Sequence, residues 1–155
     1  MEYIVIKWLH IVSSTFLFGT GGGSAFYKYV IDRSRDVRAI AQVARWVVVA
    51  DWIFTTPTVI FQPLSGIYLA SLIGLPLSTP WLALSLVLYA LAGACWLPVV
   101  ILQIRMRGIA QQALREAKPL PALYWRYTRI WFWLGVPAFL MLVGVFYLMV
   151  AKPTF

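Results

Sequence analysis

The sequence predicts an all-α polytopic membrane protein that folds as an antiparallel bundle of four transmembrane helices. Of the 155 residues, 62% are hydrophobic and only 12% are charged, whereas a soluble domain is roughly 45–50% apolar with about a quarter of its residues charged. Residues 52–104 contain no Asp, Glu, Lys or Arg, and no water-soluble fold of this size could bury such a segment. These observations exclude a soluble enzyme, a nucleic-acid-binding module, a secreted disulfide-stabilised domain and a disordered chain.

The lengths of the apolar segments predict four helices. About 20 apolar residues cross the hydrocarbon core as a helix, and the charge-free segments 8–27 and 130–151 are about this long. The central segment would form a helix of roughly 80 Å, so it must turn back. Residues 74–80 contain two prolines and a glycine, which mark that turn. We therefore expect a single domain over residues 1–155, with helices near 3–29, 40–72, 81–107 and 124–151.

The basic residues predict the orientation of the bundle. Eleven of the thirteen Lys and Arg residues lie in or beside the connections 30–39 and 108–123, while the turn at 73–80 is uncharged. Because basic loops stay on the cytoplasmic side, both connections are expected in the cytoplasm and both termini outside, in a bacterial inner membrane. Contact with anionic lipid headgroups then explains the net charge of +8 without a nucleic-acid partner. Within 108–123, the spacing of Ile109, Ala113 and Ala117 predicts a short interfacial helix.

The second helix carries polar residues at spacings that place them on one face, namely Asp51, Thr55, Thr58, Gln62 and Ser65. Polar groups within lipid point toward the protein interior, so this face is expected either to contact other helices or to line a cavity. Kinks at Pro57 and Pro63 would widen such a cavity.

Asp51 is the only acidic residue within the expected spans. An isolated ionised carboxylate at this depth would cost roughly 2.5–3.5 kcal/mol. We expect Asp51 to form an ion pair with Arg105 or Arg129, and the alternative is a carboxylate that exchanges protons.

His10 is the only histidine, and its spacing places it on one face of the first helix with Lys7 and Ser14. Histidine is a common ligand of metals and of haem, and Met149 is expected at a similar depth on the last helix. Three ligand sets are therefore open: His10 with Met149, two His10 side chains across a homodimer, or His10 alone. Lys7 would attract an anionic group of the ligand, and Gln62 would supply a hydrogen bond. The alternative is a purely structural hydrogen bond made by His10.

Residues 19–25 of the first helix are small and include four glycines. Small residues allow a neighbouring backbone to approach closely. We expect this run to pack against another helix, and the alternative is contact with a flat cofactor.

The segment Lys7-Trp8-Leu9-His10-Ile11 resembles the K-x-L-H-I element of HemJ-type and CopD-type membrane proteins. Over essentially the whole chain, segments 50–52, 62–66, 77–81 and 149–153 resemble a four-helix bacterial family, domain of unknown function 2269. The HemJ resemblance implies haem b associated with His10 and Lys7, and protoporphyrinogen oxidation, whereas the CopD resemblance implies copper handling. Unlike HemJ, this sequence has no second histidine, so one chain cannot supply two histidine ligands.

Three functions remain open at this point. The first is binding of haem b or a metal through His10, as a HemJ-like oxidoreductase if the protein is an enzyme. The second is transport of a small solute or proton by an oligomer, along Asp51, Thr55, Thr58 and Gln62. The third is a non-catalytic assembly protein whose polar faces only pack. The chain has no nucleophile–base pair or multi-residue metal motif, and we expect a homodimer embedded in lipid.

Overall fold

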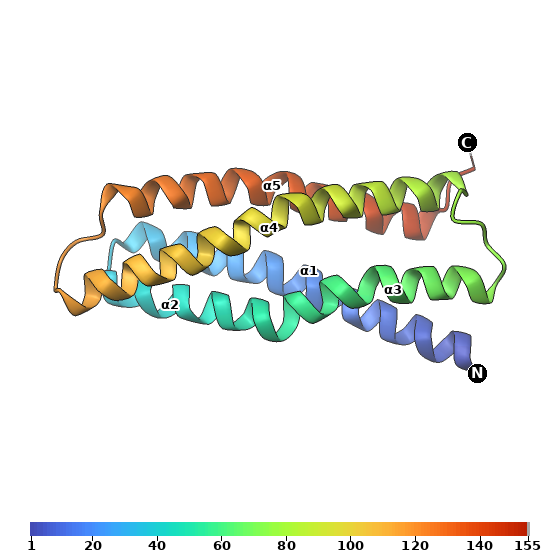
Figure 1. Ribbon diagram of the computed structural model, residues 1–155, viewed down its shortest axis with the longest axis horizontal. Coiled ribbons are helices and arrows are strands. Elements are labelled where there is room, and N and C mark those ends of the chain that lie inside the picture. Colours follow the sequence, from blue (N-terminus) through green and yellow to red (C-terminus); the bar gives the residue numbers. More distant parts are fainter. Residues whose placement is uncertain (155) are drawn as a thin grey trace.

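Four helical rods lie side by side and antiparallel (Figure 1) in the computed structural model, which describes residues 1–154. Each rod is long and apolar enough to cross a membrane, and residues 1–154 contain no strand. The predicted all-α bundle of four spans is therefore confirmed. The rods are α1 (Glu2–Ser34), a second rod made of α2 (Val37–Ala50), η1 (Asp51–Thr55) and α3 (Thr56–Leu72), then α4 (Pro80–Arg115) and α5 (Ala122–Ala151).

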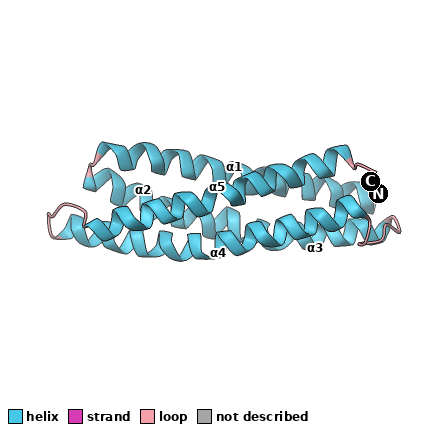
Figure 2. Cartoon of the chain, turned by 90° about the horizontal axis from the view of Figure 1, so that it is seen from above, coloured by secondary structure: helices cyan, strands magenta, loops and turns pink. Residues whose placement is uncertain are grey.

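The connections lie at the two ends of the bundle, as a view from above also shows (Figure 2). Both termini and the turn at 73–79 lie at one end, which we call the terminal end. The connections 35–36 and 116–121 lie at the other end, which we call the basic end because arginine and lysine residues surround it. Most polar loop backbone is thereby kept out of the apolar middle of the bundle.

The helices extend further at the basic end than the sequence predicted. Residues 30–34 continue α1, and residues 108–115 continue α4 instead of forming a loop with a separate interfacial helix. Ala110 and Ala113 are buried against the rest of the bundle, so packing favours continuation of the helix past Gly108. The helix ends only beyond Arg115, where Ala117 adopts a left-handed backbone with φ of 51°.

The second rod begins at a side-chain cap and contains a local irregularity. Asp36 Oδ1 accepts hydrogen bonds from the backbone N–H groups of Arg38 and Ala39 at 2.9 and 3.4 Å, which starts the helix at residue 37. Residues 51–55 then form a π-helical turn, in which the Thr56 N–H donates to the Asp51 carbonyl. Pro57 has no N–H to pair with a carbonyl in the preceding turn. Such π-turns are frequent at functional sites.

The packing of the helices is uneven. A core of buried apolar residues joins α2, α4 and α5 toward the basic end, and it includes Ile40, Met106 and Tyr124. Along the rest of the bundle, α4 packs on α5 and α1 packs on the second rod, but α1 and α5 make few contacts with each other. Because α3 and α4 also make few contacts, the structure leaves space between these two pairs of helices, and the cavities described below occupy it.

Cysteine labelling tests the arrangement of the two ends. In a Cys95→Ala background, we expect Ser78→Cys in intact cells to react with a membrane-impermeant maleimide, because the turn at 73–79 is uncharged and the basic loops stay inside. Lys118→Cys should react only after the membrane is permeabilised. Labelling of both positions from the same side would contradict a four-span bundle, whereas the reverse pattern would contradict only the predicted orientation.

Candidate functional site

A cavity of about 420 Å³ lies at the terminal end, between α1, α3, α4 and α5. Its size falls within the range of about 300–1,000 Å³ that is typical of small-molecule sites. Its walls are mainly apolar, and they include all four residues for which the sequence predicted contact with a cofactor: Lys7, His10, Gln62 and Met149. The structure therefore brings together residues from three different helices. We call the space that they line the terminal cavity.

The imidazole of His10 is held from one side. Its Nδ1 lies 2.7 Å from Ser65 Oγ, and the Ser65 hydroxyl donates to the Phe61 carbonyl at 2.7 Å. Because a hydroxyl has only one proton to donate, this arrangement makes His10 Nδ1 the donor to Ser65 Oγ. The lone pair then lies on Nε2, which makes no hydrogen bond within residues 1–154. A second-shell hydrogen bond of this kind selects the tautomer that can bind a metal.

Gln62 and Gly66 complete the support of His10. The Gln62 amide donates to the His10 carbonyl at 2.8 Å and to Ser13 Oγ at 3.0 Å, which fastens α3 to α1. At Gly66, an added Cβ would lie 3.4 Å from His10 Cε1. Gly66 therefore packs close to the imidazole, at a distance where even a methyl group would be in ordinary van der Waals contact with the ring.

Two lysines make this cavity positive at its rim. Lys7 and Lys152 both line the cavity and are exposed, and neither forms a salt bridge within the part of the chain that the structure describes. Their ammonium groups lie 5.7 and 5.9 Å from the ring centroids of Tyr3 and Trp81, respectively. Lys152 was not among the residues predicted from the sequence.

A metal site built from several protein ligands is not present at this position. Within residues 1–154, no three His, Cys, Asp or Glu side chains are close enough together to hold a metal ion. A metal at His10 would therefore need ligands of other kinds, such as the thioether of Met149 or donor atoms of a bound cofactor.

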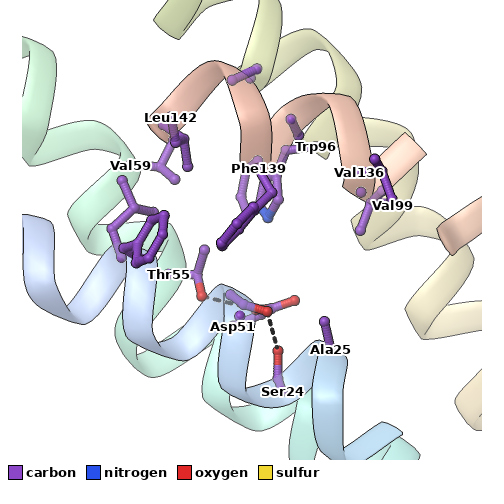
Figure 3. A pocket seen from close by; sticks show the side chains of 18 of the residues that line it. Ser24, Ala25, Asp51, Thr55, Val59, Trp96, Val99, Val136, Phe139 and Leu142 are labelled. Carbon is purple, nitrogen blue, oxygen red and sulfur yellow. Dashed lines mark hydrogen bonds between the residues drawn. The ribbon is translucent and has the colours of Figure 1, made fainter. Parts of the chain in front are cut away.

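A second cavity of about 370 Å³ adjoins the first, nearer the middle of the bundle. We call it the central cavity; Leu17, Phe18, Tyr89 and Leu142 line both cavities. Figure 3 shows Asp51 and Thr55 on one wall of it, with Trp96 and Phe139 across from them. Much of the space is created by small residues on three helices, among them Gly22, Gly93 and Gly135.

The polar face of the second rod is divided between the two cavities. Asp51 and Thr55 line the central cavity, and Gln62 lines the terminal cavity. Ser65 forms the hydrogen bond to His10 Nδ1. Thr58 lines neither cavity; its hydroxyl donates to the carbonyls of Phe54 and Thr55 in its own rod.

The predicted ion pair of Asp51 is wrong. Asp51 forms no salt bridge within the described chain; its Oδ1 instead accepts a hydrogen bond from Thr55 at 2.9 Å. Asp51 is buried, whereas Arg105 and Arg129 are both exposed. The long arginine side chains remain where their charge is solvated, so they do not follow the carboxylate into the bundle.

For most of its length, the glycine run does not pack against another helix of the described chain. A Cβ added at Gly19, Gly21 or Gly23 would meet no atom within 4 Å, and only at Gly22 would it contact a neighbour, Phe139 Cε2 at 3.5 Å. Since Gly21 and Gly22 line the central cavity, the run widens this cavity instead of holding another helix against α1.

A buried ion pair at the basic end was missed in the sequence. Lys28 Nζ lies 2.5 Å from Asp32 Oδ2, and the Tyr124 hydroxyl donates to Asp32 Oδ1 at 2.7 Å and accepts from Lys28 at 3.1 Å. Lys28 was expected to be one of the orienting charges, yet it is only 2% exposed. Opposite charges four residues apart on a helix are a signal for such a pair, but nothing in the sequence links them to Tyr124.

Substitutions at this pair test whether removing one of the two charges destabilises the fold more than removing both. Asp32→Asn leaves a buried ammonium uncompensated and should lower the free energy of unfolding by about 3–5 kcal/mol, whereas Lys28→Met combined with Asp32→Leu should cost less. Thermal unfolding in mild detergent measures the difference. Glu116→Gln is the matched control, because it breaks the exposed Lys118–Glu116 pair and should change stability by less than about 1 kcal/mol. Equal effects of Asp32→Asn and Glu116→Gln would contradict a structural role for the buried pair.

Comparison with known proteins supports the membrane assignment. A family model described as "Predicted integral membrane protein (DUF2269)" matches residues 4–153. No curated protein and no solved structure matches the chain. Because the family description mentions no ligand and no reaction, the function must be inferred from the two cavities.

Proposed function

The chain belongs to the DUF2269 family of predicted integral membrane proteins, and we propose that it binds haem b in the terminal cavity with His10 as axial ligand. The observation that carries this proposal is the environment of His10. Ser65 holds Nδ1 at 2.7 Å, which leaves the Nε2 lone pair available in a cavity of about 420 Å³. Imidazole presented in this way is the usual protein ligand of haem iron.

The other residues of the cavity suit the remaining parts of haem b. The mainly apolar walls would contact the macrocycle, and the ammonium groups of Lys7 and Lys152 would attract its two propionates at the rim. Met149 lines the same cavity, which supports the pair His10 and Met149 over a pair of histidines across a dimer. When bound, haem would supply one-electron redox chemistry, and a methionine ligand would raise its reduction potential.

The location proposed for this site follows from the charge distribution. With the basic connections in the cytoplasm, the terminal cavity would open toward the outer face of a bacterial inner membrane. A homodimer, a transport route along the second rod and a non-catalytic assembly role remain predictions from the sequence.

An absorption spectrum tests the proposal. Protein purified in mild detergent, loaded with haemin and then separated from unbound haemin by gel filtration, should show a Soret band corresponding to one haem per chain, because Nε2 of His10 would bind the iron. His10→Ala should lose this band, whereas Met149→Leu should keep a Soret band and lower the reduction potential. Lys7→Gln should weaken the affinity without removing the band.

Trp8→Phe serves as the control, because Trp8 is exposed on the same helix and does not line the cavity; its spectrum should match that of the unmodified protein. Haem at 100 times its dissociation constant should also stabilise the fold by about 2.7 kcal/mol. A protein that shows neither a Soret band nor a change in unfolding temperature after haemin addition would overturn the proposal.

A further inference from the structure

Three buried polar atoms without a hydrogen-bond partner belong to residues that line the central cavity. Across residues 1–154, these atoms are Asp51 Oδ2, Gln103 Oε1 and Trp131 Nε1, and all three residues line that cavity. The residues are only 5%, 5% and 6% exposed, so solvent at the bundle surface does not satisfy them. Buried polar atoms in native proteins nearly always have a partner, and three exceptions in one space indicate a polar occupant.

Water alone does not account for this space. A water molecule occupies about 30 Å³ and needs two to four polar partners, so a cavity of about 370 Å³ would need roughly a dozen waters with many more polar groups than it has. Most of its lining is apolar, and six of the side chains are large and aromatic: Phe18, Tyr89, Trp96, Trp131, Phe132 and Phe139. The lining therefore suits an occupant with a ring-shaped apolar body and a small polar part.

The central cavity reaches the lipid-facing surface of the bundle. Phe139 and Leu140 line the cavity and are also 39% and 62% exposed. They lie on α5, which makes few contacts with α1 apart from the stacking of Phe139 on Phe18, and a Cβ added at Gly21 of α1 would meet no atom within 4 Å. An occupant would therefore enter sideways from the bilayer, which requires it to be soluble in lipid.

We propose that the central cavity binds a lipid-soluble aromatic alcohol of the phenol or quinol class. Its hydroxyl group would donate to Asp51 Oδ2 or Gln103 Oε1 and accept from Trp131 Nε1, since a hydroxyl is both donor and acceptor. Its ring would pack against Phe139 and Trp96, which point toward Asp51 in Figure 3. Aromatic pairs of this kind add stability beyond the area they bury.

The unpaired donor and the two unpaired acceptors favour a hydroxyl group over a lipid-soluble amine. A protonated amine could donate to the two acceptors, but it would leave the Trp131 N–H without a partner. This site is separate from His10, so it does not depend on haem binding in the terminal cavity.

Binding of 1-naphthol to the purified protein in mild detergent, measured by isothermal titration calorimetry, tests the proposal. We expect saturable binding with one site per chain, and at least tenfold weaker binding of naphthalene, which has the ring but no hydroxyl. Gln103→Leu and Trp131→Phe should each weaken the binding of 1-naphthol roughly tenfold, the effect of losing one hydrogen bond. Asp51→Leu should weaken it at least as much.

The matched controls are Gln42→Leu and Trp133→Phe, because both residues are exposed and neither lines the central cavity. These variants and His10→Ala should bind 1-naphthol as the unmodified protein does, which separates this site from the proposed haem site. Gln103→Leu and Trp131→Phe each remove a polar atom that lacks a partner, so both should stay folded and decide the outcome even if Asp51→Leu does not fold. Equal affinity for naphthalene and 1-naphthol, equal losses in the control variants, or tighter binding of 1-naphthylmethylamine would overturn the proposal.

Discussion

The structure depends on the requirement that polar groups surrounded by lipid find partners within the protein. This requirement explains why the described chain is almost entirely helical and why its connections lie at the two ends of the bundle. It also explains the buried network of Lys28, Asp32 and Tyr124, in which each polar group is paired. Against this background, the few unpaired groups near the centre of the bundle are informative, because lipid offers them no partner.

The weak contact between α1 and α5 determines where ligands can be held. The contact between α3 and α4 is also weak, whereas the core joining α2, α4 and α5 toward the basic end is closely packed. Two adjoining cavities lie in the space that these weak contacts leave, although Phe18 of α1 stacks on Phe139 of α5 there. The cavities share Phe18 and Tyr89, so ligands in both would be separated only by a few side chains.

The candidate site could be predicted only where helical spacing was sufficient. His10 and Lys7 lie on one face of the first helix, and Asp51, Thr55 and Gln62 lie on one face of the second rod, so their inward positions followed from periodicity. The partners of these residues could not be predicted in the same way. Ser65 hydrogen-bonds to His10, and Tyr124 contacts Lys28. Gln103 and Trp131 line the same cavity as Asp51. Each of these arrangements joins distant parts of the chain.

The sequence by itself determined that lipid surrounds most of the chain, how many times the chain spans the membrane, and which face of each helix points inward. It could do so because hydrophobicity and helical period are local properties. The tertiary structure decided which inward groups meet, and it reversed two expectations that rested on local pattern. Asp51 has no arginine partner because the arginines stay in the polar layer, and the glycine run has few contacts because only Phe139 of α5 approaches it within the described chain. Contacts between helices depend on the packing of whole surfaces, which no single segment specifies.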